Sequence, residues 1–468
     1  MAPVRDGDRF AFRHLVIRDV AYETLTKEDR ADLHERVGDW IELTAASGAS
    51  TYDEIVGYHL EQAYRYHVAL HAFDDQARRL AGRACSLLAE AGRRAYRRGD
   101  VPATIALLAR ALDLIEKDEP RRPALLVDLG RAAMGVFRLH EAEAAFTEAV
   151  EAAATAGEEG AELIAQVALL SYRRLLGWVH IRRCELGLAA TALEQGIEAG
   201  RRIGDVLLRI DLPNLVVALA RGAAPTSYAL ARGLELLELA RGDRLTEASV
   251  ESALGVVHAL RGEFEHGRAL VHRAIFVHEE LGHLMGVEVH QHGLGYIEAL
   301  ARNWPAHESA WQHVHQASVA IGRRDWIVES AVELGESLYR IGRVHEAGRF
   351  AAIAAEQAVP HHHGPDTQAP LLRLQAKLRA HDGAHEEADR LGREALAASF
   401  GVDSPWLQAD TLMDLAEVLE LAGRPDEARE AVKRALQLYE QKEHLVGVER
   451  ARAALASRVS SQANKDSA

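Results

Sequence analysis

The chain has few of the residues that stabilise secreted folds or interrupt helices. Its 468 residues include only two cysteines, Cys85 and Cys184, too few for a disulfide framework or a thiolate metal site. It has only 12 prolines, and aromatic residues make up 6% of it. No apolar run approaches the roughly 20 residues that a membrane-spanning helix needs. The first ten residues, MAPVRDGDRF, lack the apolar core of a signal peptide, which predicts a cytoplasmic location.

The balance of charge also excludes a class of partners. The formal net charge of −15 at pH 7 opposes nonspecific binding to DNA, RNA or anionic membranes. Hydrophobic residues make up 48% of the chain and charged residues 27%, which is typical of a chain with a large buried core. Alanine and leucine are abundant, which favours helices packed through small side chains. We therefore expect an all-α protein with no direct nucleic-acid partner and no membrane partner.

The motifs of common catalytic sites are missing as well. The sequence contains no G-x-x-x-x-G-K-[ST] phosphate-binding loop and no G-x-S-x-G nucleophile turn. Carboxylates are numerous, but they alternate with arginine, as in AREAVKRAL, which is typical of a solvated helix face. We expect no enzymatic activity, no catalytic residue and no cofactor.

The 24 histidines invite a metal-binding interpretation, which their spacing does not favour. His278 and His283 are five positions apart, about 500° around a helix, so they would not share a helix face. His290 and His292 are two apart and would diverge. The run His361, His362 and His363 lies between prolines and is expected in an exposed loop. The pattern predicts solvated histidines and no metal site, with a weak metal site in this His-rich loop as the alternative.

What the sequence does contain is a repeated helical hairpin, clearest in residues 409–440. Apolar residues at i, i+3, i+4 and i+7 predict a first helix: Leu412, Leu415, Ala416 and Leu419. Gly423 and Pro425 then supply a helix end and a helix start. A second apolar stripe follows at Ala428, Val432 and Ala435.

In this order the hairpin resembles a tetratricopeptide repeat, with Ala416 where that repeat usually has Gly and Glu440 where it usually has Pro. The resemblance implies a right-handed superhelix of helical hairpins, an α-solenoid in which each hairpin buries its apolar face against its neighbours.

A small residue at the tight helix crossing marks the other copies. The marks are Gly92, Gly130, Gly177, Ala218, Gly255, Gly295, Gly335, Ala376 and Ala416, and the last five follow one another at intervals of 40 or 41 residues. This period predicts an array of about nine repeats over residues 83–456, longer than the usual repeat of about 34 residues. Pro213 and the segment RGAAPTS weaken the unit around Ala218. The polar residues 457–468 predict a disordered tail.

The first part of the chain predicts a short strand around Phe10, a helix from Leu15 and a helix capped by Thr26. It resembles the end of the ATPase module, near its winged-helix part, in bacterial regulators of the STAND (signal-transduction ATPase) type. The residues that carry this likeness are Phe10, Phe12, His14, Ile17, Arg18, Asp19, Tyr22, Arg30, His34, Tyr58 and His59.

The resemblance implies that residues 1–82 are an ATPase-junction-like segment with capping helices. Such regulators often carry a cyclase or DNA-binding domain. Since the P-loop is missing, we expect a fragment or a stand-alone relative of such a regulator.

In tetratricopeptide repeats the first helix of each hairpin lines the concave groove. The register assigns twelve residues to such a groove: Arg93, Tyr96, Arg131, Arg174, Trp178, His292, Tyr296, Glu336, Tyr339, Asp410, Glu417 and Glu420. Their order implies a groove that runs from basic through aromatic to acidic, with residues 409–440 as its acidic end and C-terminal cap. For Trp178, Trp304 and Trp311 the sequence favours packing in the core or between repeats over contact with a ligand.

These patterns predict a noncatalytic sensor or scaffold module of a bacterial signalling or transcription regulator. Its partner would be a protein or a peptide. Two alternatives stay open at this point: a stand-alone adaptor that scaffolds other proteins, and a receptor for a peptide or a small-molecule effector.

Overall fold

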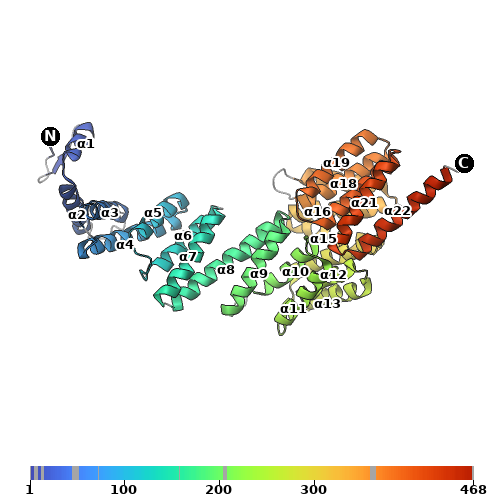
Figure 1. Cartoon of the computed structure of the whole chain (residues 1–468), viewed down its shortest axis with the longest axis horizontal. Helices are drawn as coiled ribbons and strands as arrows, with labels where there is room; N and C mark the ends of the chain where they lie inside the picture. The colour runs from blue at the N-terminus through green and yellow to red at the C-terminus, as the bar shows by residue number, and fades with distance from the viewer. Residues whose placement is uncertain are drawn as a thin grey trace. The chain divides into compact units, whose positions relative to one another are not determined.

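The computed structural model of the chain describes residues 2–4, 9–11, 15–44, 52–71, 73–136, 138–157, 159–203, 208–358 and 365–465. These residues are almost entirely helical and form two compact units, Met1–Tyr172 and Arg173–Ala468, which we call unit 1 and unit 2. Figure 1 labels the helices in chain order. None of the helices in the described ranges is both long and apolar enough to span a lipid bilayer.

Unit 1 begins with a small antiparallel pair of strands, in which Pro3 is paired with Phe10, and continues with helices. Its elements are β1 (Ala2–Val4), β2 (Arg9–Ala11), α1 (Leu15–Glu23), α2 (Lys27–Thr44), α3 (Asp53–Val68), α4 (Asp75–Arg97), α5 (Val101–Asp113), α6 (Arg122–Gly135), α7 (Leu139–Ala156) and the first part of α8 (Glu159–Arg182). The predicted cap at Thr26 is confirmed, because the Asp29 amide donates to Thr26 Oγ1 at 3.1 Å.

Several residues that carry the STAND likeness meet in unit 1. The His34 ring lies at their centre: its Nε2 is 2.8 Å from the Tyr22 hydroxyl, and its Nδ1 is 2.8 Å from Nδ1 of His59. The Arg30 guanidinium lies over the Tyr22 ring, 4.8 Å from its centroid. The Tyr58 ring meets the His34 ring edge to face. Residues from α1, α2 and α3 therefore form one polar and aromatic cluster.

Unit 2 contains the remaining helices. They are α9 (Leu186–Ile203), α10 (Leu208–Arg221), α11 (Thr226–Ala240), α12 (Arg244–Leu260), α13 (Phe264–Glu280), α14 (Leu284–Leu300), α15 (Trp304–Ile321), α16 (Arg324–Arg340), α17 (Val344–Gln357), α18 (Pro365–His381), α19 (His385–Phe400), α20 (Pro405–Leu421), α21 (Pro425–Lys442) and α22 (Leu445–Lys465). In the described part of the chain, helices α4 to α21 make nine consecutive hairpins, so the predicted all-α, tetratricopeptide-like solenoid of about nine repeats is confirmed.

The small residues of the predicted register lie where two helices approach closely. A Cβ added to Gly295 would lie 2.4 Å from Nε1 of Trp311, and one added to Gly130 would lie 2.6 Å from Cε1 of Phe146. Both aromatic rings are buried, and each follows its glycine by sixteen positions. In each of these hairpins the glycine on the first helix therefore leaves the space that an aromatic ring on the second helix fills.

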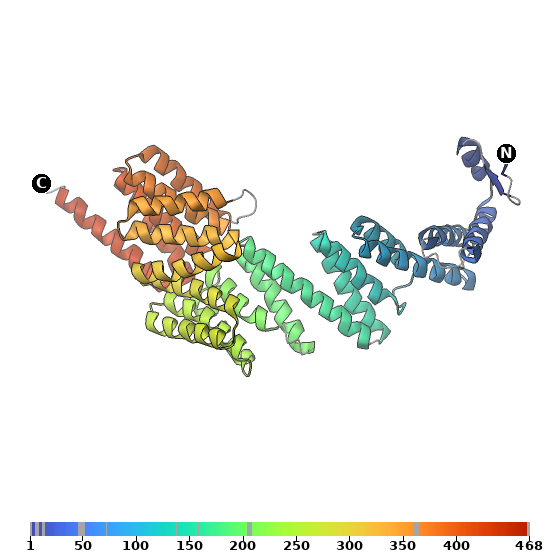
Figure 2. The same cartoon turned by 180° about the vertical axis from the view of Figure 1, so that it is seen from behind.

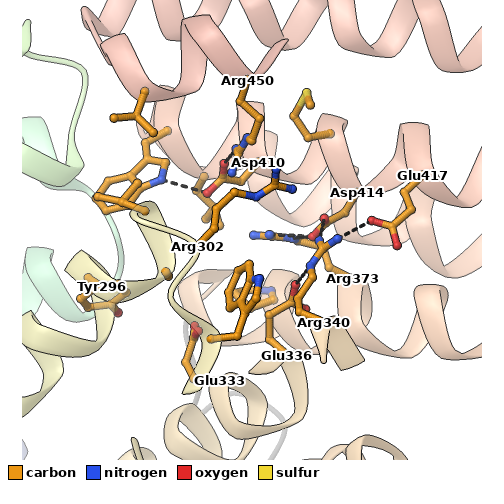
Figure 3. A pocket seen from close by; sticks show the side chains of 18 of the residues that line it. Tyr296, Arg302, Glu333, Glu336, Arg340, Arg373, Asp410, Asp414, Glu417 and Arg450 are labelled. Atoms are coloured by element: carbon orange, nitrogen blue, oxygen red, sulfur yellow. Dashed lines mark hydrogen bonds and ion pairs between the residues drawn. The ribbon is translucent and has the colours of Figure 1, made fainter. Parts of the chain in front are cut away.

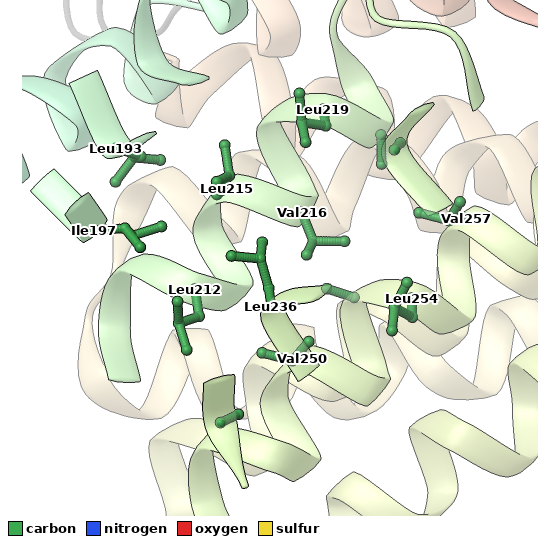
Figure 4. Close-up of a cluster of buried hydrophobic side chains, with 14 of the residues drawn as sticks. Leu193, Ile197, Leu212, Leu215, Val216, Leu219, Leu236, Val250, Leu254 and Val257 are labelled. Atoms are coloured by element: carbon green, nitrogen blue, oxygen red, sulfur yellow. The ribbon is translucent and has the colours of Figure 1, made fainter. Parts of the chain in front are cut away.

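The core of unit 2 includes an aliphatic cluster supplied by five successive helices, α9 to α13 (Figure 4). Leu193 of α9, Val216 of α10, Leu236 of α11 and Leu254 of α12 are all nearly inaccessible to solvent. Pro213 lies inside α10, which runs through it without interruption. The weak unit of the sequence is therefore a regular member of the stack.

The C-terminal cap differs from the prediction. Residues 409–440 do not end the array, because α22 follows them and packs Val448 and Ala451 against the core of α20 and α21. The helix α22 continues to Lys465, into the segment for which the composition predicts a disordered tail. The boundary at residues 82 and 83 stays a prediction.

Unit 2 closes on itself through residues more than 180 positions apart in sequence. Asp403, before α20, accepts hydrogen bonds from the amides of Leu186 at 2.7 Å and Gly187 at 2.6 Å, and so caps the N-terminus of α9. Glu443 does the same at α11, where it accepts from the Ser227 amide at 3.0 Å. Helices α20 and α22 accordingly lie beside α10 and α12 (Figures 1 and 2).

A buried lysine completes this closing contact. Lys442, fully buried at the end of α21, donates to the carbonyl oxygens of Leu219, at 2.7 Å, and Ala224. Its own carbonyl accepts from the Thr226 hydroxyl at 2.9 Å. Burial lowers the pKa of Lys442 to about 8, so the ammonium is still mostly protonated at pH 7. A cation at the C-terminus of α10 also complements the helix dipole.

The glycine register can be tested with one methyl group. Gly295→Ala would force a Cβ against the Trp311 indole, so we expect a loss of about 1–3 kcal/mol in the free energy of unfolding, measured by urea denaturation. Gly348→Ala is the matched control. Nothing lies within 4 Å of a Cβ at that helical position, so it should stabilise the protein by about 0.5–1 kcal/mol. Equal effects of the two substitutions would contradict the register.

The closing lysine gives a second test. Lys442→Met keeps the length of the side chain but leaves the carbonyls of Leu219 and Ala224 without their buried donor, which should cost about 1–3 kcal/mol. Urea denaturation measures this loss, and small-angle scattering should show a larger radius. The exposed Lys433→Met is the control and should change neither. A Lys442→Met protein as stable and as compact as the wild type would show that the contact does not hold the unit closed.

Candidate functional site

The closed part of unit 2 encloses a pocket of about 760 Å³. Its walls come from α14, α16, α18, α20 and α22, and from the turns beside them (Figure 3). The described lining residues include five arginines and eight carboxylates: Arg221, Arg302, Arg340, Arg373 and Arg450, with Glu329, Glu333, Glu336, Asp410, Asp414, Glu417, Glu420 and Glu449. The pocket is therefore densely charged and carries an excess of negative charge.

An ion network centred on Asp414 forms one wall. This carboxylate is 5% exposed and accepts from Arg373 Nε at 2.7 Å, Arg340 Nη2 at 2.9 Å and Lys377 Nζ at 3.3 Å. Arg340 also binds Glu336 and Glu417, each at 2.7 Å. These ion pairs thus join the helices α16, α18 and α20.

The pKa values of these groups follow from the pairing. Burial alone would raise the pKa of Glu336, but Lys377 and Arg340 outweigh it and lower that pKa to about 2. Burial likewise opposes ionisation of Asp414, and the cations of Arg373, Lys377 and Arg340 hold its pKa well below the usual value. Glu336 and Asp414 are therefore ionised throughout the physiological pH range, and their ion pairs hold the wall in place.

A second node joins α20, α21 and α22 around Asp410. Trp406 Nε1 donates to Asp410 Oδ2 at 2.9 Å, and the Tyr439 hydroxyl and Arg450 also donate to this carboxylate. Burial would raise the pKa of Asp410, and the Arg450 and Arg373 charges lower it instead. The indole of Trp406 is thereby held in place in the lining of the pocket.

An aromatic wall faces this node. The Tyr296 hydroxyl donates to Glu329 at 2.8 Å, and its ring meets the Trp406 ring edge to face. Burial opposes the ionisation of Glu329, but the neighbouring His292, Arg221 and Tyr296 lower its pKa to about 2. The pocket therefore offers ring faces and edges beside fixed charges.

The structure brings one half of the predicted groove together. Tyr296, Glu336, Asp410, Glu417 and Glu420 line the pocket. The Tyr339 hydroxyl donates to Glu417 at 2.8 Å, directly behind the lining. His292 lies deeper, with its ring 4.9 Å from that of Trp311 and 4.7 Å from that of Trp326.

The other predicted groove residues do not line this pocket. Arg93 is paired with Asp128 at 2.8 Å, and Tyr96 and Arg131 are exposed on unit 1. Arg174 makes a bidentate pair with the fully buried Asp211. Trp178 is 43% exposed, so it is not a core residue of the repeat.

The predicted acidic end of the groove is wrong in one respect. Asp410 and Glu417 are paired with Arg450 and Arg340, so this end is a salt-bridged wall and not a field of unpaired carboxylates. The helical register could not locate these arginines, because Arg340 and Arg450 fall outside the positions that it assigns to the groove. For Arg302 a signal existed, since it stands 40 residues from the turn glycines Gly262 and Gly342.

The expectation of solvated histidines is wrong for the cluster in α13 and α14. His278 and His290 are each 3% exposed, and burial lowers the pKa of His290 to about 3. His283 follows the end of α13, so the chain turns and brings its Nδ1 to 2.9 Å from Nδ1 of His278. Among the described residues no group of three or more His, Cys, Asp or Glu side chains is arranged to hold a metal ion. His361, His362 and His363 lie outside the described residues.

Comparison with known proteins gives distant structural matches. No family profile and no curated protein matches the sequence. The Cut9–Hcn1 hetero-tetramer of the APC/C matches over 96% of this chain and 93% of its own, with 13% identity and a TM-score of 0.44. The Rap conjugation gene regulator of plasmid pLS20, in complex with the Phr* peptide, matches over 70% and 97%, with 12% identity and a TM-score of 0.49.

A tetratricopeptide repeat protein from Parabacteroides merdae matches over 72% of this chain and 98% of its own, with 16% identity and a TM-score of 0.34. At these values the fold assignment rests on the period and packing of the chain's own hairpins.

The Asp414 network can be tested by neutralising its centre. Asp414→Asn would leave Arg373 and Lys377 buried beside an amide, so we expect a loss of about 3–5 kcal/mol in the free energy of unfolding. Urea denaturation at neutral pH measures it. Glu427→Gln removes a carboxylate from the exposed pair with Arg424 and should leave stability nearly unchanged. If Asp414→Asn were as stable as this control, the network would not hold the wall.

Proposed function

We propose that the protein is a noncatalytic binding scaffold whose unit 2 pocket receives a short peptide segment of a partner protein. The observation that carries this proposal is the pocket of about 760 Å³. It lies inside the closed turn of the solenoid, the part of unit 2 in which α20 and α22 lie beside α10 and α12. That volume falls in the range of about 300–1,000 Å³ that is usual for ligand sites. The ion pairs around Asp414 and Asp410 fix its walls before any ligand arrives, which lowers the entropic cost of binding.

The character of the lining supports a peptide in particular. The lining combines carboxylates and arginines with the rings of Tyr296, Trp304 and Trp406. A peptide presents charges of both signs, apolar side chains and backbone hydrogen-bonding groups along its length. Such a ligand can match a wall of mixed charge, and charge complementarity then sets its specificity.

A small-molecule effector is the second candidate, because the volume alone would suit it. The charges extend from Arg221 at the end of α10 to Glu449 on α22. A compact ligand would contact only a small part of this lining, so the peptide is favoured.

The wider role that we propose is that of a sensor or scaffold module in a cytoplasmic bacterial signalling or transcription regulator of the STAND type. The support is the cluster of Tyr22, Arg30, His34 and His59, which unites residues of the N-terminal likeness. In this role the peptide or protein signal received by unit 2 would be passed to an ATPase partner or domain.

The binding proposal is tested with the full chain and an immobilised library of short peptides. Wild-type protein should retain a defined subset. Ala453→Trp places an indole on an exposed lining position of α22, and it should reduce retention at least about tenfold. Ala397→Trp, on an exposed position of α19 outside the pocket, is the matched control and should bind as the wild type does. Retention of no peptide by the wild type, or equal retention by both variants, would refute the proposal.

A further inference from the structure

Arg302 occupies a backbone position at which several other hairpins have glycine. It lies in the turn between α14 and α15 with φ of +56°, in the left-handed region that disfavours residues with a Cβ. The equivalent turns have Gly262, Gly342, Gly383 and Gly423, all with positive φ. An arginine has therefore replaced glycine where the backbone conformation is least suited to it.

Two other non-glycine residues in the described part of the chain have positive φ, and each has a structural reason. Cys184 is 1% exposed and fills a buried site. Glu443 accepts from the Ser227 amide and so takes part in the closing contact. Arg302 has neither reason: it is exposed to solvent, and within the described ranges no carboxylate is close enough for an ion pair with it. Its strain is unexplained by the fold.

The side chain of Arg302 extends into the pocket beside Arg450 (Figure 3). The two neighbouring arginines already form ion pairs. Arg450 is paired with Asp410. Arg340 is paired with Glu336, Asp414 and Glu417. Partial burial and the charges of Arg450 and Arg340 lower the pKa of the Arg302 guanidinium. Glu417 partly opposes this effect. The Arg302 guanidinium itself forms no ion pair within the described ranges, so it is available to an anionic ligand group.

Among anionic groups, the pocket as a whole disfavours those that carry more than one charge. Its described lining carries eight carboxylates against five arginines, so a phosphate dianion would meet strong repulsion from groups such as Glu417. A carboxylate carries a single charge, and its two oxygens match the planar donor fork of arginine. Trp304, two residues along the chain, also lines the pocket and offers an apolar contact beside this fork.

We propose that Arg302 anchors a carboxylate of the bound peptide, either its C-terminal carboxylate or an Asp or Glu side chain. This inference rests on the proposed function, since it names the ligand group that the peptide pocket selects. In this proposal Arg302 fixes the register of the peptide, whereas the neighbouring paired arginines hold the pocket wall in place.

The experiment compares four full-length proteins: wild type, Arg302→Gly, Arg302→Lys and the control Arg241→Ala, whose arginine directly follows α11 and pairs with Glu238. The probe is a library of short peptides, each made as C-terminal acid and amide, with Asp and Glu kept, replaced by Asn and Gln, or replaced by phosphoserine. Dissociation constants are then measured by calorimetry for the retained peptides. Melting temperatures are measured for all four proteins.

Wild type and Arg241→Ala should bind one carboxylate form at least about tenfold more tightly than its amide or Asn/Gln counterpart. Arg302→Gly should lose this preference, and Arg302→Lys should retain part of it. Arg302→Gly should melt at the same temperature as the wild type or higher, because glycine suits a positive φ. The terminal and side-chain series identify which carboxylate is bound.

Three results would overturn the anchor while leaving the peptide pocket intact: equal binding of acid and neutral forms by wild type, the same preference in Arg302→Gly, or tighter binding of phosphoserine peptides. A lower melting temperature of Arg302→Gly would assign Arg302 to the fold and would also overturn it. If wild type bound no peptide at all, the proposed function and the anchor would fail together.

Discussion

The closing contact of unit 2 is the constraint on which its pocket depends. Asp403 and Glu443 bind amides at the N-termini of α9 and α11, and Lys442 binds carbonyls at the C-terminal end of α10. Each charge has the sign that the helix dipole favours at its end, and each satisfies backbone groups that a helix leaves unpaired. A stack of hairpins is otherwise held only between neighbours, so this contact adds a tie across more than 200 residues.

The pocket follows from that closure. Once α20 and α22 return beside α10 and α12, the inner faces of α14, α16 and α18 are covered, and their charges meet charges from α20 and α22. Asp414 can then face Arg340, Arg373 and Lys377 in one place. Buried ion pairs add little net stability against an apolar packing of the same volume, but they fix geometry. The same network thus explains both a rigid wall and a site that is selective for charge.

Local patterns in the sequence sufficed for the repeat itself. Small residues such as Gly295 and Ala416 recur at a fixed period, and the helical hairpins follow from it. The pocket could be predicted only in part: Tyr296, Asp410 and Glu417 were assigned to a groove from the register, whereas their pairing with Arg340 and Arg450 required the closed turn. Such pairings join residues many repeats apart or residues on different helices, and a single period contains no information about them. His278 and His283 meet for a similar reason, because the chain turns between them.

The most direct test of the closed turn is a distance across it in solution. Spin labels on cysteines at Tyr228 and Leu445, two exposed positions next to the contact between Ser227 and Glu443, report this distance by pulsed dipolar spectroscopy. The native Cys85 and Cys184 are buried and should not be labelled. The closed turn requires one short and narrow distance distribution. A long or broad distribution would show an open solenoid, in which the charged walls do not meet and the pocket does not exist.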